Sequence, residues 1–314
     1  MKKKVVFYGN CHTGAVIKNL RTCKEFNENY YIYPVEEIQN VKDPSYFDSP
    51  FFSDCDVLIH QSIWEKNRYG KEFASSNVIS KVKKDCQVIA MPNLYHLPTC
   101  LFPQLYDAPE LRYKERTYFF RDKIIDQGII AGMTLKEIAD KYYDYRFGAE
   151  KIRENYYKFL DVVEKREAEW DIKVKSFIDE NIAQKALFYE PNHPTNVLIR
   201  YYTQELIKIL FGRNITVPMV NDAEMDTYQM PMLTEVKDAL GLSYSSKDME
   251  IRKTGTKIIS VPMDIRQYVD QYFASIWMSK DFANKYRIES RAKYYYLRMK
   301  SKKKNFIKLL SHSK

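Results

Sequence analysis

A cysteine and a histidine, Cys11 and His12, stand where a short apolar segment passes through Gly9 and Asn10 into a helical pattern. In an open α/β sheet, ligands bind at such junctions between a strand and the following helix. A thiol in the first turn of a helix lies beside free backbone N–H groups and the positive end of the helix dipole, which favour the thiolate. The same N–H groups can stabilise an oxyanion. Cys11 is therefore a candidate nucleophile; the alternative is a small buried residue in a tight turn.

The spacing of Gly9 and Gly14 invites comparison with phosphate-binding loops, but specific residues argue against them. A P-loop needs Lys and then Ser or Thr after its second glycine, and this chain has Ala15 and Val16. A dinucleotide-binding G-x-G-x-x-G fails because its second glycine is replaced by cysteine. A cysteine phosphatase loop would need an arginine at position 17, which is isoleucine here.

A nucleophilic cysteine needs a base, and the best placed of the five histidines is His193. It lies in a turn-rich segment with two prolines, directly before a helical pattern. Glu190, three residues earlier, is spaced to orient the imidazole as the third member of a triad. The alternative is that His193 is an ordinary residue near a Thr195 helix cap. His12 adjoins the cysteine, and neighbouring side chains at a helix start usually diverge.

Two further strand ends carry amide side chains, Gln61 and Asn93. Either amide is suited to an oxyanion or a substrate hydroxyl, and either reads equally well as an ordinary turn residue. His96 follows Asn93 closely and is a candidate for the lining of a pocket. His60 is expected to point to the far face of its strand.

The elements that must position these residues are strand and helix units in the first hundred residues. Short apolar runs separated by helical patterns predict a parallel sheet covered on both faces, with all strand-to-helix turns on one edge. The expected strands are Lys4–Tyr8, Asn29–Val35, Asp56–Gln61 and Gln87–Asn93, and the expected helices are His12–Lys24 and Asn77–Asp85.

From about residue 117 the pattern becomes helical. Thr134 and Glu137 match a capping box, and residues 149–185 contain no Pro or Gly, which predicts one or two long helices. The segment 186–196 interrupts them. The further expected elements are a helix over 197–212, a loop over 217–232, a strand within 255–262 and a helix over 265–279.

The predicted fold class is therefore α/β, with a Rossmann- or SGNH-like parallel sheet and a large helical C-terminal half. We expect one catalytic domain over residues 1–289, sheet-rich over 1–115 and mainly helical over 116–289. The 314-residue chain shows no apolar run of membrane-spanning length and no signal peptide, so a cytoplasmic protein is expected. Its five cysteines form no C-x-x-C pair, so free thiols and no metal site are expected.

The net charge of +9 is concentrated in residues 290–314, which contain nine Lys or Arg residues and no acidic residue. Tyrosines, leucines and a phenylalanine alternate with these cations. This composition suits peripheral contact with an anionic membrane; the alternative is a solvated terminus. No nucleic-acid partner is expected, because no basic patch is evident outside this tail.

Four short segments together resemble the WcbI-type polysaccharide biosynthesis proteins over roughly residues 3–280. They are Tyr8–His12, Gln61, Met91–Asn93 and Asn192–Thr195. Two departures stand out: the family more often has Gln at position 12, and the His-Pro pair expected after the third segment is spaced out as His96-Leu97-Pro98.

The resemblance implies a bacterial capsule enzyme that transfers an acyl group, expected to be acetyl, from coenzyme A to a sugar hydroxyl. Cys11, His193 and Glu190 would be catalytic, and Gly9, Asn10, His12, Gln61, Asn93 and His96 would bind substrate or the oxyanion. Two mechanisms stay open: acylation of Cys11, or direct attack of a hydroxyl activated by His193.

Two other functions also fit these residues. The spacing is similar to that of SGNH hydrolases, with cysteine in place of serine, so an esterase or deacetylase is one alternative. A non-catalytic scaffold that binds a glycan or nucleotide is the other. The sequence does not indicate an oligomeric state.

Overall fold

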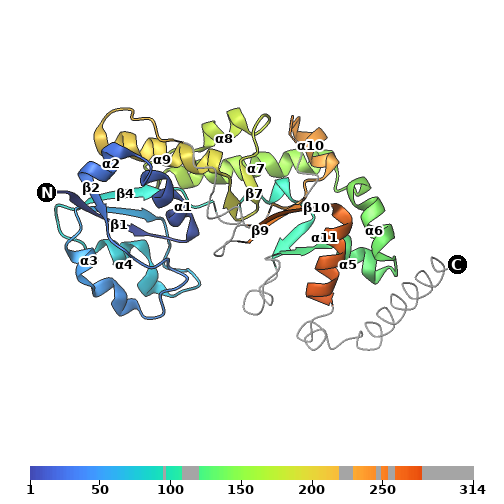
Figure 1. The fold of residues 1–314 in the computed structure, drawn as a ribbon, viewed down its shortest axis with the longest axis horizontal. Coiled ribbons are helices and arrows are strands. Elements are labelled where there is room, and N and C mark those ends of the chain that lie inside the picture. The colour runs from blue at the N-terminus through green and yellow to red at the C-terminus, as the bar shows by residue number, and fades with distance from the viewer. Residues whose placement is uncertain (95–96, 108–119, 219–228, 245–248, 254–258, 278–314) are drawn as a thin grey trace.

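The computed structural model describes residues 1–94, 97–107, 120–218, 229–244, 249–253 and 259–277. Figure 1 shows a parallel sheet at one end of an elongated molecule and a largely helical part at the other. Helices α7 (Ala149–Glu167) and α9 (Asn196–Phe211) run along one side and link the two ends. The predicted α/β class, with a parallel sheet in the N-terminal part and a helical C-terminal half, is confirmed.

The parallel sheet has the strand order β2-β1-β3-β4. Its strands are β1 (Lys3–Tyr8), β2 (Tyr30–Ile32), β3 (Val57–Gln61) and β4 (Gln87–Met91), and every adjacent pair is parallel. The chain leaves β1 toward one side for β2 and then returns to the other side for β3. The carboxyl ends of β1 and β3 therefore form the switch point at which open α/β sheets bind ligands.

Alternate residues of these strands enter two cores, one on each face of the sheet. Val5 and Phe7 pack into the larger core together with residues of α9 and α1 (Cys11–Leu20). Val6 and Tyr8 pack into a smaller, aromatic core with Phe47 and neighbouring side chains. Because both faces are covered, the strands read as nearly continuous apolar runs.

Several predicted elements of the N-terminal part differ in length from the observed ones. The helix expected over His12–Lys24 ends at Leu20, and a second helix, α2, covers Lys24–Asn29. Strand β2 ends at Ile32, and Tyr33 donates one more hydrogen bond to the Val5 carbonyl at 2.9 Å before Pro34. In place of the helix expected over 77–85 there is the short helix α4 (Ser75–Ile79). The other short helical turns of this part are η1 (Pro44–Asp48), α3 (Pro50–Ser53), η2 (Lys71–Phe73) and η3 (Thr99–Leu101).

The helical part follows the predicted pattern more closely. Thr134 and Glu137 form both hydrogen bonds of a capping box at the start of α6. The run 149–185 contains one long helix of 19 residues, as expected, and a second helix of only seven. The elements are α5 (Lys123–Ile130), α6 (Leu135–Lys141), η5 (Tyr142–Asp144), α7, α8 (Lys175–Asn181), α9, α10 (Thr234–Leu240), α11 (Ile265–Tyr272) and the π-helical turn η6 (Phe273–Trp277).

Three short antiparallel ladders complete the described structure. They pair β5 (Leu105–Asp107) with β6 (Phe120–Asp122), β7 (Phe188–Glu190) with β8 (His193–Pro194), and β9 (Met249–Lys253) with β10 (Ile259–Met263). Only β10 lies in a segment where a strand was expected. Strands β5 to β8 have only two or three residues, too few for a period-two pattern to be recognised in the sequence.

A buried polar cluster fixes helix α11 to the rest of the helical part. Asp122 is fully buried and caps α5 by accepting the Ile124 N–H at 2.9 Å. Its carboxylate also accepts the Tyr268 hydroxyl of α11 at 3.1 Å. Next to it, Asp126 forms an ion pair with Arg121 at 2.8 Å and accepts the Trp277 indole N–H at 2.8 Å. These contacts join segments about 150 residues apart in the sequence.

The predicted basic tail, residues 290–314, lies outside the described residues, so its contact with a membrane stays a prediction, as does the domain boundary at 289. Within the residues that are described, no helix has the length and apolarity needed to cross a membrane.

Candidate active site

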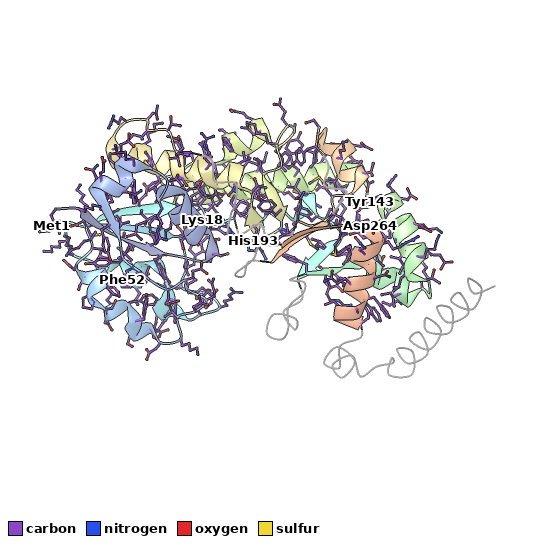
Figure 2. All side chains as sticks on the ribbon, in the orientation of Figure 1. Met1, Lys18, Phe52, Tyr143, His193 and Asp264 are labelled. Carbon is purple, nitrogen blue, oxygen red and sulfur yellow. The ribbon has the colours of Figure 1, made fainter. Side chains whose placement is uncertain are left out.

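The structure brings Cys11, His193 and Glu190 together in a row. The Cys11 sulfur lies 3.6 Å from His193 Nε2, although 182 positions separate the two residues in the sequence. On the other side of the ring, His193 Nδ1 lies 2.9 Å from Glu190 Oε1. Figure 2 shows His193 near the middle of the molecule, between the parallel sheet and the helical part. This is the connectivity of a nucleophile, a base and an orienting carboxylate.

The β7–β8 hairpin holds the carboxylate and the imidazole in register. Glu190 and His193 are paired across the ladder, with only Pro191 and Asn192 between them. The second carboxylate oxygen of Glu190 accepts the Asn192 N–H at 2.8 Å. Glu190 is 1% exposed, so its carboxylate is shielded from water. The hairpin leads directly into α9, which packs on α1, and so carries His193 to the start of the helix that begins at Cys11.

His12 fixes the same hairpin from the other side. Its ring is completely buried, and its Nε2 lies 2.8 Å from the Asn192 carbonyl oxygen. A carbonyl can only accept, so Nε2 donates this hydrogen bond. Burial lowers the pKa of His12 to about 4, so the ring is neutral at physiological pH. This contact makes His12 a positioning residue for the His193 loop.

Charges around His193 favour its imidazolium form. Burial by itself would lower the pKa of His193, but the Glu190 carboxylate and the Cys11 sulfur raise it to about 10. A protonated ring beside the sulfur can donate its Nε2 proton to a leaving group, which is the role of the base in a cysteine–histidine pair.

Asn10 caps the helix that begins with Cys11. Its side-chain oxygen accepts the His12 N–H at 3.0 Å, and its backbone carbonyl accepts the Thr13 N–H at 2.9 Å. Two of the N–H groups of the first turn are therefore already bonded. The N–H of Cys11 itself and the side-chain NH₂ of Asn10 remain as the natural donors to an oxyanion at this turn.

Gln61 links the strand ends at the switch point through hydrogen bonds of its side-chain amide. It is fully buried, its Oε1 accepts the Asn10 N–H at 2.8 Å, and its Nε2 donates to the Pro92 carbonyl at 3.1 Å. It thus connects the carboxyl ends of β1, β3 and β4 with one side chain. Gly9 makes room for it, because a Cβ at position 9 would lie 2.5 Å from Gln61 Oε1 and 2.7 Å from Thr13 Cγ2.

Substitution of Gly9 by alanine is expected to lower the free energy of unfolding by about 1–3 kcal/mol, the usual cost of overpacking. It should also lower activity, because Gln61 must move and release the N–H of Asn10. Chemical denaturation and a turnover assay measure both effects. Gly212→Ala is the control: an added Cβ there meets nothing within 4 Å and only the left-handed backbone is strained, so stability should fall while activity per folded molecule is kept. Wild-type stability and activity in Gly9→Ala would contradict this account.

A pocket of about 300 Å³ opens beside Asn10. Asn93, which follows β4, also faces it, and the Asn93 carbonyl accepts a hydrogen bond from Arg166 at 3.1 Å. Most of the other lining residues come from the loop after β3 and from the end of α7. The polar and aromatic ones among them are Trp64, Lys66, Asn67, Arg68, Tyr69, Arg166 and Trp170.

The sequence analysis did not identify the aromatic and basic residues that line this pocket. A loop that follows a parallel strand and contains Trp, Lys, Asn, Arg and Tyr in succession was a usable signal for residues 64–69, because such loops lie at the ligand-binding edge. Arg166 gave no comparable signal, since a basic residue near the end of a helix is common.

The remaining predicted positions have other surroundings or are not described. His60 is buried and its Nδ1 lies 3.2 Å from the Gln61 carbonyl, away from the pocket lining. His96 lies outside the described residues. All five cysteines are free thiols. Within the described part of the chain, no group of three or more His, Cys, Asp or Glu side chains is arranged to hold a metal ion.

Comparison with known proteins places these features in a family. The family described as the polysaccharide biosynthesis enzyme WcbI matches residues 4–210. No curated protein matches the chain. A similar solved structure is that of WcbI, a polysaccharide biosynthesis enzyme, described as the native protein without a disulfide bond between coenzyme A and one of its cysteines. The two structures superpose with a TM-score of 0.71 at 18% identity, over 96% of this chain and 99% of that one. The matched residues include Cys11 at the start of α1 and His193 in the β7–β8 hairpin. The chain belongs to the WcbI family of polysaccharide biosynthesis enzymes.

Proposed function

We propose that this protein transfers an acyl group, acetyl in the simplest case, from coenzyme A to a hydroxyl group of a sugar used in a surface polysaccharide. The observation that supports this most directly is the row of Cys11, His193 and Glu190, which follows directly on Asn10 in the lining of a pocket. Membership of a family of polysaccharide biosynthesis enzymes supports the sugar acceptor. The description of the similar solved structure, which refers to coenzyme A and a cysteine of that protein, supports the donor.

In the first step, the Cys11 thiolate attacks the carbonyl carbon of the acyl thioester. The bond from that carbon to the sulfur of coenzyme A breaks, and the imidazolium of His193 donates its Nε2 proton to the departing sulfur. The products are an acyl thioester on Cys11, free coenzyme A and a neutral His193. The raised pKa of His193 suits this step, because the ring begins it protonated.

In the second step, neutral His193 takes the proton from the sugar hydroxyl as the oxygen attacks the acyl-Cys11 carbonyl. The carbon–sulfur bond breaks, the acyl sugar leaves, and the thiolate–imidazolium pair is restored. Glu190 stabilises the ring each time it becomes charged. In both steps the oxyanion would accept hydrogen bonds from the Cys11 N–H and the Asn10 side-chain amide.

Coenzyme A and acetyl-CoA are expected to raise the melting temperature of the purified protein in a saturable way. A ligand that binds only the folded state adds about 2.7 kcal/mol of stability at a concentration a hundred times its Kd, which is a rise of several degrees. Thermal shift with calorimetry as a check measures this.

The controls for this titration separate the alternatives. Cys11→Ala and His193→Ala should still bind coenzyme A but should lose transfer. A well-folded protein that is not stabilised by coenzyme A would contradict the proposal and favour a hydrolase that acts on acyl sugars. Full biosynthetic function in both variants would leave only a scaffold role.

A further inference from the structure

The pocket is lined by Asn10, the residue that immediately precedes Cys11 in the chain. Asn10 both lines this pocket and caps the helix that begins at Cys11. Gln61 and Asn93 line the same wall from the ends of β3 and β4. A ligand in the pocket therefore lies at the switch point of the sheet, against the residue that precedes Cys11. Its volume of about 300 Å³ lies at the small end of the range for ligand sites.

The charge of the pocket selects for an anion. Lys66, Arg68 and Arg166 all belong to its lining, and none of the described lining residues is acidic. The carboxylate of Glu169 is close by, where it accepts the Trp64 indole N–H at 2.9 Å. Phosphate is the ligand group that paired arginine and lysine side chains most commonly recognise.

Aromatic rings hold the two arginines in place. The Arg166 guanidinium lies 5.1 Å from the centre of the Trp64 ring, and the Arg68 guanidinium lies 4.7 Å from that of Tyr69. Arg166 also donates to the Asn93 carbonyl, and Arg68 donates to the Tyr69 hydroxyl; these contacts fix the plane in which each guanidinium presents its N–H groups. Trp64 remains 53% exposed, which is high for so large an apolar side chain. An exposed indole next to amide side chains is a suitable surface for the apolar face of a sugar ring.

The length of coenzyme A argues against its phosphates as the ligand of this pocket. The thiol of coenzyme A must reach Cys11 in the proposed reaction. Its pantetheine arm then carries the diphosphate away by roughly 14 Å, the length of about four extended residues. A compact pocket that begins at Asn10 has room for a sugar and an attached phosphate, with the cations Lys66 and Arg68 exposed at its mouth.

We infer that this pocket is the acceptor subsite and that the acceptor is a phosphorylated sugar, either a sugar phosphate or a sugar nucleotide. The inference rests on the proposed function. The sugar ring lies against Trp64 and the amides of Asn10 and Asn93, and its phosphate binds Lys66 and Arg68. The acyl group is then added to an activated monosaccharide, and the reaction that consumes the product is glycosyl transfer to a growing chain.

The test is a binding titration with UDP-glucose, GDP-mannose, glucose 1-phosphate, inorganic pyrophosphate and glucose, each with and without saturating coenzyme A. We expect the phosphate-bearing sugars to bind together with coenzyme A and to quench the fluorescence of the two tryptophans in the lining, Trp64 and Trp170, a signal that Trp64→Phe should reduce. Glucose alone should bind too weakly to measure. The double variant Lys66→Gln with Arg68→Gln should weaken the phosphate-bearing probes about tenfold to hundredfold, the loss expected for charge-assisted hydrogen bonds.

Lys84→Gln is the matched control. It also removes one exposed cation, but it lies outside the pocket, before the amino end of β4, and should leave every affinity unchanged. The inference is overturned if no phosphate-bearing probe binds, if these probes compete with coenzyme A, or if the double variant loses coenzyme A affinity instead. Failure of wild-type protein to bind coenzyme A would instead refute the proposed function, and the probe titrations would still report on the pocket.

Discussion

Replacement of Cys11 by serine is expected to lower kcat/KM for acyl transfer by about a thousandfold, or about 4 kcal/mol of transition-state stabilisation. Serine keeps the shape of the side chain, and His193 stays within reach. The hydroxyl, however, is not ionised near neutral pH, so the anionic nucleophile is lost. A steady-state assay with acetyl-CoA measures the loss. Mass spectrometry of the intact protein, mixed with acetyl-CoA in the absence of acceptor, should show one added acetyl group in wild type and none in the variant.

Cys86→Ser is the matched control for this experiment. Cys86 is a half-buried thiol like Cys11, but it precedes β4 at the opposite edge of the sheet. Its replacement should leave both acetylation and turnover unchanged. If Cys11→Ser keeps most of its activity while His193→Gln is inactive, the hydroxyl attacks acetyl-CoA directly and the covalent mechanism is wrong.

Replacement of Glu190 by glutamine is expected to move the high-pH limb of the kcat/KM profile for acetyl-CoA to lower pH. The active form of the free enzyme has a protonated His193, so activity falls as pH rises through the pKa of that ring. In wild type the limb lies near pH 10, because the carboxylate of Glu190 and the sulfur of Cys11 outweigh the effect of burial. Without the carboxylate, burial dominates and lowers the pKa of His193. At about pH 8 the variant should be slower than wild type by about tenfold to a hundredfold.

The pH dependence of the unfolding free energy provides a second test of the Glu190–His193 ion pair. His193 has a higher pKa in the folded protein, about 10, than its ordinary value of 6.5. The stability that the pair contributes is therefore fully present below about pH 6.5 and is lost as pH rises toward 10. The difference in unfolding free energy between wild type and Glu190→Gln should be largest at about pH 6 and shrink at higher pH.

Direct titration of the His193 ring by NMR checks the cause of both effects. Glu150→Gln, at an exposed position in the first turn of α7, removes a carboxylate far along the chain and should change neither profile. A high-pH limb that does not move in Glu190→Gln would show that Glu190 does not control the charge of His193.

The sequence alone was sufficient for the features that depend on neighbouring residues. The run from Lys4 to Cys11 predicts a buried strand, a turn and a helix start, because apolar runs and helix caps are set within a few positions. The same holds for the parallel sheet, for the capping box at Thr134 and for the spacing of Glu190 and His193. These local signals were enough to single out Cys11, His193 and Glu190 as candidates and to suggest the family.

Only the tertiary structure decided which of these residues meet. Cys11 and His193 come within 3.6 Å because α9 packs on α1, and that contact depends on two buried helix faces. The order of the strands made Gln61 a link between three strand ends, and the burial of His12 made it a support for the Asn192 turn. The cations of the pocket come from a loop and from the end of a distant helix. Surface residues such as Arg166 have no periodic pattern, so their place at a site becomes visible only when the chain has folded around it.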